Sequence, residues 1–95
     1  MILHTFNKGL GAEQLMRRCS ALVTSDDAIL LIEDGVYWGT ATLAPFPMQH
    51  PRVFALTADV AARGLATRIA QAITTVDHAG FVQLCVEHDT VKSWF

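Results

Sequence analysis

The feature that most constrains this chain is the uninterrupted apolar run AILLI at 28–32, which lies between the polar segments SDD at 25–27 and Glu33-Asp34. A strand with one face in water alternates apolar and polar side chains, whereas a strand covered on both faces is apolar throughout. The run therefore predicts a strand inside a parallel sheet, with helices packed on both of its faces.

The rest of the chain alternates between strand-like and helix-like patterns. We expect further strands at 2–6, 53–56 and 73–76 and in the tail 89–95, and helices at 12–23, from Thr57 to a stop at Gly64, and at 78–88. Residues 65–72 read either as a second short helix or as an irregular connection. Strands that alternate with helices form βαβ units with right-handed crossovers. The fold class is therefore α/β, a single domain over 1–95 with an open, mostly parallel sheet and helices on both faces, in flavodoxin-like layers.

Two aspartates mark expected helix starts. Asp77 precedes the helix at 78–88, and Asp34 precedes a helical segment that carries Val36 and Tyr37. A carboxylate at such a position can accept a hydrogen bond from the first free backbone N–H groups of the helix. The helix at 12–23 has an apolar stripe that we expect to be buried, formed by Leu15, Met16, Cys19, Leu22 and Val23.

The apolar content exceeds what one small domain can enclose. The 95 residues are 52% hydrophobic and 17% charged, and a domain of this size buries only about 60–65% of the surface of its unfolded chain. We therefore expect an apolar surface that partner proteins cover. Aromatic and methionine side chains beside polar residues or prolines are typical interface anchors, although they could equally fold back as cover for the sheet. The candidates are Trp38, Phe46, Met48, Trp94 and Phe95.

Charge and motif content exclude several classes of function. The formal net charge is −2 and the 7 Lys and Arg residues are scattered, so no basic face for nucleic acid is evident. We find neither a signal peptide nor a run long enough to span a membrane, and expect a cytoplasmic protein with two free thiols. The four histidines (His4, His50, His78 and His88) lack metal-ligand spacing, and the sequence has no phosphate-binding glycine motif, so we expect no cofactor. His4, within a strand, is expected to be a hydrogen-bonded interior residue.

Three places in the sequence could carry chemistry: Cys19, Cys85 and the pair Glu33-Asp34. Cys19 is either a packed helix residue or a nucleophile whose thiolate is favoured by the adjacent Arg17 and Arg18. Cys85 shares a helix face with apolar residues and is expected to pack in the core. Glu33 and Asp34 follow a buried strand, where ligands bind in open α/β sheets, but a role in cap and loop geometry is the simpler interpretation.

An ordered set of motifs resembles the DsrH/TusB family of DsrE-like sulfur-relay subunits, over nearly the whole chain. The set comprises LHT at 3–5, Cys19, LLIEDGVY at 30–37, FAL at 54–56 with Asp59, ARG at 62–64, VDHAGFVQL at 76–84 and VKSWF at 91–95. The resemblance implies a DsrE-like fold and a heterohexamer with DsrE/TusD-like and DsrF/TusC-like subunits. It also implies proteins that donate and accept persulfide sulfur, and it places the principal persulfide cysteine on the DsrE/TusD-type partner.

The function implied by the resemblance is that of a subunit of a cytoplasmic sulfurtransferase complex. This complex passes persulfide sulfur towards 2-thiolation of the tRNA wobble uridine, and this subunit mainly assembles and presents partners. Cys19 matches a cysteine of DsrH-type members and is a candidate auxiliary sulfur acceptor. Three alternatives stay open: a DsrH-type subunit in dissimilatory sulfur oxidation, a stand-alone sulfurtransferase that uses Cys19, and a receiver-like or small-ligand module that uses Glu33 and Asp34.

Overall fold

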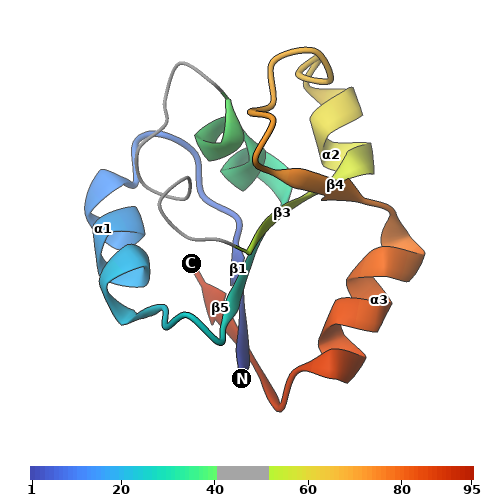
Figure 1. Ribbon diagram of the computed structural model, residues 1–95. Coiled ribbons are helices and arrows are strands. Elements are labelled where there is room, and N and C mark those ends of the chain that lie inside the picture. Colours follow the sequence, from blue (N-terminus) through green and yellow to red (C-terminus); the bar gives the residue numbers. More distant parts are fainter. Residues whose placement is uncertain (41–51) are drawn as a thin grey trace.

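Figure 1 shows the computed structural model of the chain, which describes residues 1–40 and 52–95. Strands and helices alternate along the chain, as the sequence predicts. The elements are, in order, β1 (Ile2–Phe6), α1 (Glu13–Leu22), β2 (Ala28–Leu31), the 3-10 helix η1 (Glu33–Gly39), β3 (Val53–Leu56), α2 (Thr57–Ala62), β4 (Thr74–Val76), α3 (His78–Glu87) and β5 (Thr90–Trp94). Residues 65–72 form an irregular connection, which is the second of the two alternatives left open above.

The five strands form one parallel sheet in the order β4-β3-β2-β1-β5. The first four strands step across the sheet in one direction, and the chain then returns from β4 at one edge to β5 at the other. Because crossovers between parallel strands are right-handed, a reversal of direction moves the connecting helix to the opposite face. Accordingly, α3 lies on one side of the sheet and α1 on the other (Figure 1).

The sheet separates two apolar layers, and β2 contributes to both. Ile29 and Leu31 pack into the larger layer with side chains of α1, η1 and α2, and Ala28 and Leu30 pack into the smaller layer under Leu84 of α3. All four β2 side chains are buried. The prediction from the run at 28–32 is therefore confirmed, with helices on both faces of the sheet.

The predictions for the helix ends are confirmed at Asp77 and Gly64 and wrong at Asp34. The Asp77 carboxylate accepts a hydrogen bond of 2.8 Å from the backbone N–H of Gly80, and Gly64 has a φ of +67° just after α2. Asp34 does not cap a helix, because η1 already begins at Glu33 and the Asp34 carboxylate instead pairs with Arg63. Among the described residues, every helix is too short or too polar to cross a lipid bilayer.

Two further positions show how packing departs from a simple helical pattern. Leu22, the last residue of α1, is 59% exposed, so the predicted stripe on this helix is wrong at that position. Gly35 lies so close to β1 that a Cβ atom there would stand 2.0 Å from the Phe6 carbonyl oxygen. Only glycine permits this approach of η1 to the end of β1.

Candidate functional site

Cys19 lies in the centre of the larger apolar layer. The side chain is 0% exposed, and it packs with Met16 of the same helix and with apolar side chains of the sheet. Burial raises the pKa of the Cys19 thiol to about 12, against a smaller lowering effect of Lys92. Because the thiolate is the nucleophilic form, this environment suppresses the chemistry that a sulfur acceptor needs. Of the two alternatives for Cys19, the structure shows the packed helix residue.

The arginines that precede Cys19 face away from this layer. Arg17 and Arg18 are both exposed, and the Arg17 guanidinium lies 2.9 Å from the Glu13 carboxylate one helical turn earlier. Helix geometry explains the separation, since residues one and two positions apart point in different directions. Adjacency in the sequence therefore does not place a positive charge against the Cys19 sulfur.

The predicted interface anchors divide into buried and exposed residues. Trp38 and Trp94 are buried within the chain, and the Trp38 indole N–H donates to the carbonyl oxygens of Lys8 and Gly9, both at 3.1 Å. For these two tryptophans the prediction of a partner contact is wrong, because they complete the core of their own domain. Phe95, by contrast, is 80% exposed. The candidates Phe46 and Met48 lie outside the described residues.

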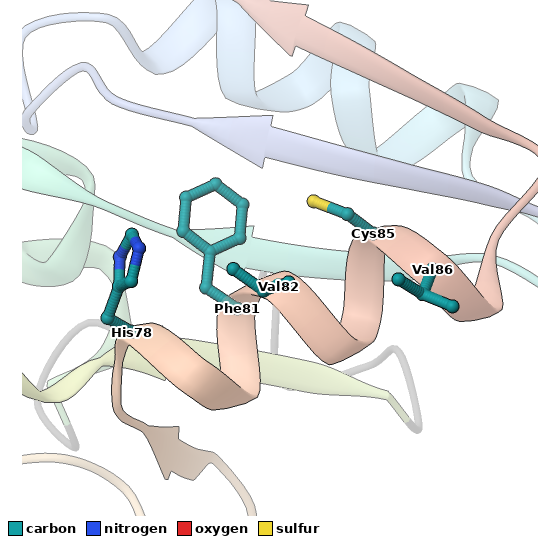
Figure 2. Close-up of a pocket in the computed structure, with 5 residues that line it drawn as sticks. All are labelled: His78, Phe81, Val82, Cys85 and Val86. Carbon is teal, nitrogen blue, oxygen red and sulfur yellow. The ribbon is translucent and has the colours of Figure 1, made fainter.

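An apolar surface that the sequence reasoning missed runs along α3. A groove of about 260 Å³ is lined by His78, Phe81, Val82, Cys85 and Val86 (Figure 2). Its inner wall, formed by Phe81 and Cys85, also packs against the smaller apolar layer, whereas Val82 is 50% and Val86 73% exposed. The helix thus has a wider apolar face than the sheet below it can cover. We call this surface the α3 face.

The sequence signal for the α3 face was present. Phe81, Leu84, Cys85 and His88 mark the side that covers the sheet, and Val82 and Val86 form a second stripe beside them at a spacing of four residues. Two adjacent stripes on one helix exceed the arc that a single sheet contact buries. Cys85 is half-buried at the boundary between them, so the prediction of a core position is only partly met.

The acidic residues after β2 are held by hydrogen bonds and ion pairs. The Asp59 carboxylate accepts the Glu33 backbone N–H at 2.7 Å, and Arg63 pairs with Asp34 at 2.9 Å and with Asp59 at 3.7 Å. Glu33 itself has a φ of 50°, the left-handed conformation that turns the chain sharply out of β2. Each of these contacts fixes the connection between β2, η1 and α2, as expected for loop geometry.

The histidines occupy unrelated places in the fold. His4 is a buried, hydrogen-bonded residue of β1, as predicted, and His88 is held by a 2.7 Å contact to the Leu84 carbonyl oxygen. His78 lies edge-on to Phe81 on the α3 face, and His50 is outside the described residues. Within residues 1–40 and 52–95, three or more His, Cys, Asp or Glu side chains nowhere gather in a group that could hold a metal ion.

Comparison with known proteins decides the family. The model of the DsrH family, described as DsrH like protein, matches residues 12–91. The chain belongs to the DsrH family. Among its relatives, Protein TusB of Escherichia coli O81 (strain ED1a) is 36% identical over 76 residues, which cover 77% of this chain and 80% of the relative. Protein TusB of Cronobacter sakazakii (strain ATCC BAA-894) is 38% identical over the same shares.

Two solved structures share the fold of this DsrH-family chain. The crystal structure of the ychN protein from E. coli superposes with a TM-score of 0.78 at 21% identity, over 98% of this chain and 97% of that one. The solution structure of Tm0979 from Thermotoga maritima gives a TM-score of 0.72 at 21% identity, over 94% and 95%. They share with this chain the α/β fold that the sequence predicts.

Proposed function

We propose that this DsrH-family chain is a subunit of a cytoplasmic sulfur-relay complex that passes persulfide sulfur towards 2-thiolation of the tRNA wobble uridine. The proposal is supported by the TusB relatives, which align over most of this chain. The net charge of −2 agrees with a subunit that does not grip tRNA itself. Its partners would be subunits of the DsrE/TusD and DsrF/TusC types in a heterohexamer, together with proteins that donate and accept the sulfur.

In this proposal, a partner subunit binds at the α3 face. Val82 and Val86 are large apolar side chains on a helix whose other side already covers the sheet, and at 50% and 73% exposure they leave much of their apolar surface in contact with water. In the edge strand β5, Val91 is also exposed, and the exposed Phe95 directly follows the end of this strand. Exposed apolar side chains of this kind are removed from water when a partner subunit binds.

The role of Cys19 in this proposal is structural. Persulfide transfer requires the acceptor thiolate to attack the outer sulfur of the donor persulfide, and the donor then leaves as a thiolate. Cys19 is fully enclosed and its pKa is raised to about 12, so neither access nor ionisation favours that step. The sulfur would instead stay on a cysteine of the DsrE/TusD-type partner, and this chain would hold that partner in place.

Co-expression with both partner subunits tests the assembly. We expect the three chains to elute together in size-exclusion chromatography, and Val86→Asp to remove this chain from the complex. Leu22→Asp is the matched control, since it places the same charge at a 59% exposed apolar site on α1, on the opposite side of the sheet. Equal effects of the two variants, or no assembly of the wild-type chain, contradict the proposed surface.

The cellular role is tested separately by deletion of the gene in its source organism. We expect 2-thiouridine to disappear from the wobble position of the affected tRNAs, measured by mass spectrometry of tRNA nucleosides. Re-expression of the wild-type chain should restore it, and the Val86→Asp chain should not. A deletion strain with normal 2-thiouridine would refute the tRNA branch of the proposal.

A further inference from the structure

Three buried side chains form a hydrogen-bonded chain across the part of the sheet that contains β2, β1 and β5. The His4 ring in β1 places Nε2 3.1 Å from Oδ2 of Asp27, which directly precedes β2. On its other side, His4 Nδ1 lies 3.0 Å from the indole Nε1 of Trp94 in β5. All three residues are less than a tenth exposed. The chain Asp27–His4–Trp94 therefore crosses three adjacent strands in the interior.

The chemistry of indole fixes the proton positions in this chain. An indole N–H can only donate a hydrogen bond, so His4 Nδ1 must accept it with its lone pair. The ring proton of neutral His4 then lies on Nε2 and is donated to the Asp27 carboxylate. Both ring nitrogens are fully used, but only while His4 is neutral.

A second proton on His4 would oppose this arrangement. It would bind at Nδ1, where N–H would then point at N–H of the Trp94 indole, and two donors cannot share a hydrogen bond. The Nε2 side would remain satisfied, because Asp27 would face an imidazolium in place of a neutral ring. Uptake of one proton thus strengthens the link to β2 and breaks the link to β5.

We propose that His4 is a proton-operated latch that holds the C-terminal strand β5 in place when neutral and releases the Trp94 side chain when protonated. The inference does not depend on the proposed function. Release would act on β5 as an edge strand, with only β1 as its partner in the described sheet, and on the exposed Phe95 that follows it.

The charged groups around His4 act on its protonation in opposite directions. Asp27 favours the protonated ring. Burial by itself raises the pKa of this carboxyl, but the backbone N–H groups of Thr24 and Ile2 and the His4 side chain lower it well below its usual range, so Asp27 stays ionised when His4 takes up a proton. Lys92, the register partner of His4 in β5, opposes protonation.

The remaining ionisable groups near this end of the sheet are less directly placed. Cys19 of α1 is neutral over the relevant range because its pKa is raised to about 12. The N-terminal ammonium group is paired with Asp89 at 3.0 Å, and Asp26 lies close enough to act on that ammonium group. The charges that act directly on His4 are therefore those of Asp27, which favours a proton on the ring, and Lys92, which opposes it.

An NMR titration of the full chain tests the latch directly. The side-chain resonances to follow are the Trp94 indole N–H, assigned through Trp94→Phe, and the His4 ring carbons, assigned through His4→Asn. We expect the indole resonance to lose its hydrogen-bonded shift with the same midpoint as the His4 ring, and its exchange with water to rise at least about tenfold. An indole resonance that stays unchanged while the His4 ring is protonated overturns the proposal, and so does a His4 ring that stays neutral until the whole protein unfolds.

Two variants separate the latch from a general effect of acid. In Trp94→Phe the opposing donor is gone, so the His4 ring should bind its proton about tenfold more tightly, a midpoint about one pH unit higher. An unchanged midpoint in this variant overturns the proposal. In His4→Asn the side-chain oxygen can still accept from the indole but cannot titrate, so the Trp94 resonance should become independent of pH. If His4→Asn fails to fold, the Trp94→Phe comparison still decides the matter.

Discussion

The enclosure of Cys19 leads to a quantitative prediction about thiol reactivity. In the variant Cys85→Ser, Cys19 is the only cysteine left, and its reaction with iodoacetamide at pH 8 reports its thiolate. Burial raises the pKa of Cys19 from 9.0 to about 12, and three pKa units lower the thiolate fraction by about a thousandfold at a pH below both values. Because the side chain is also 0% exposed, reagent contact requires α1 to open, which slows the reaction further.

The assay compares alkylation rates of the folded chain and of the same chain in guanidinium chloride, measured by mass spectrometry. We expect Cys19 to react at least about a thousandfold more slowly in the folded chain. The complementary variant Cys19→Ala leaves the half-buried Cys85 on the α3 face and should show far smaller protection. Protection of Cys19 below about tenfold, or stoichiometric addition of sulfur to Cys19 from a persulfide donor in the folded state, would refute the assignment of this thiol to the core.

Three further predictions concern stability, each measured by urea unfolding. Gly35→Ala forces a Cβ atom against the backbone of β1 and should lower the free energy of unfolding by about 3 kcal/mol, whereas Gly11→Ala, which meets nothing within 4 Å, should be nearly neutral; equal effects would contradict the close approach. Leu84→Ala removes a buried α3 side chain and should cost about 2–5 kcal/mol, while Val86→Ala on the exposed side of the same helix should change stability by less than about 0.5 kcal/mol. Asp27 has a lowered pKa, so it stabilises the fold above the unfolded-state value of 3.8 and this contribution is lost as pH falls below it. Asp27→Asn should therefore be less stable at pH 7 and lose less stability on acidification, and a variant with the wild-type acid dependence would show that other groups dominate.

The sequence by itself determined the order and type of the elements. The run at 28–32 predicted a strand buried on both faces, Asp77 marked a helix start, and Gly64 marked a helix end. These are local signals: hydrophobic periodicity, the hydrogen-bond needs of helix ends and the left-handed conformation open to glycine act within a few residues. The family motifs added the resemblance to the DsrH family, which the family comparison confirms.

Only the tertiary structure decided which apolar side chains are left for partners. Trp38 and Trp94 look like Phe95 in sequence, as aromatic residues at the ends of elements, yet two of them are buried and one is exposed. The difference arises because burial depends on what other segments bring to the same place: the carbonyl groups of Lys8 and Gly9 for Trp38, and His4 of β1 for Trp94.

The same reason explains the two cysteines. A helical stripe shows that a thiol faces the sheet, but the depth of cover above it depends on the neighbouring helices and on the path of the chain between strands. On the face that carries α1, η1 and α2, Cys19 is fully enclosed. On the face that α3 covers, Cys85 stays at the boundary of an open groove. The right-handed return from β4 to β5 produces this asymmetry, because it moves one helix to the opposite face of the sheet.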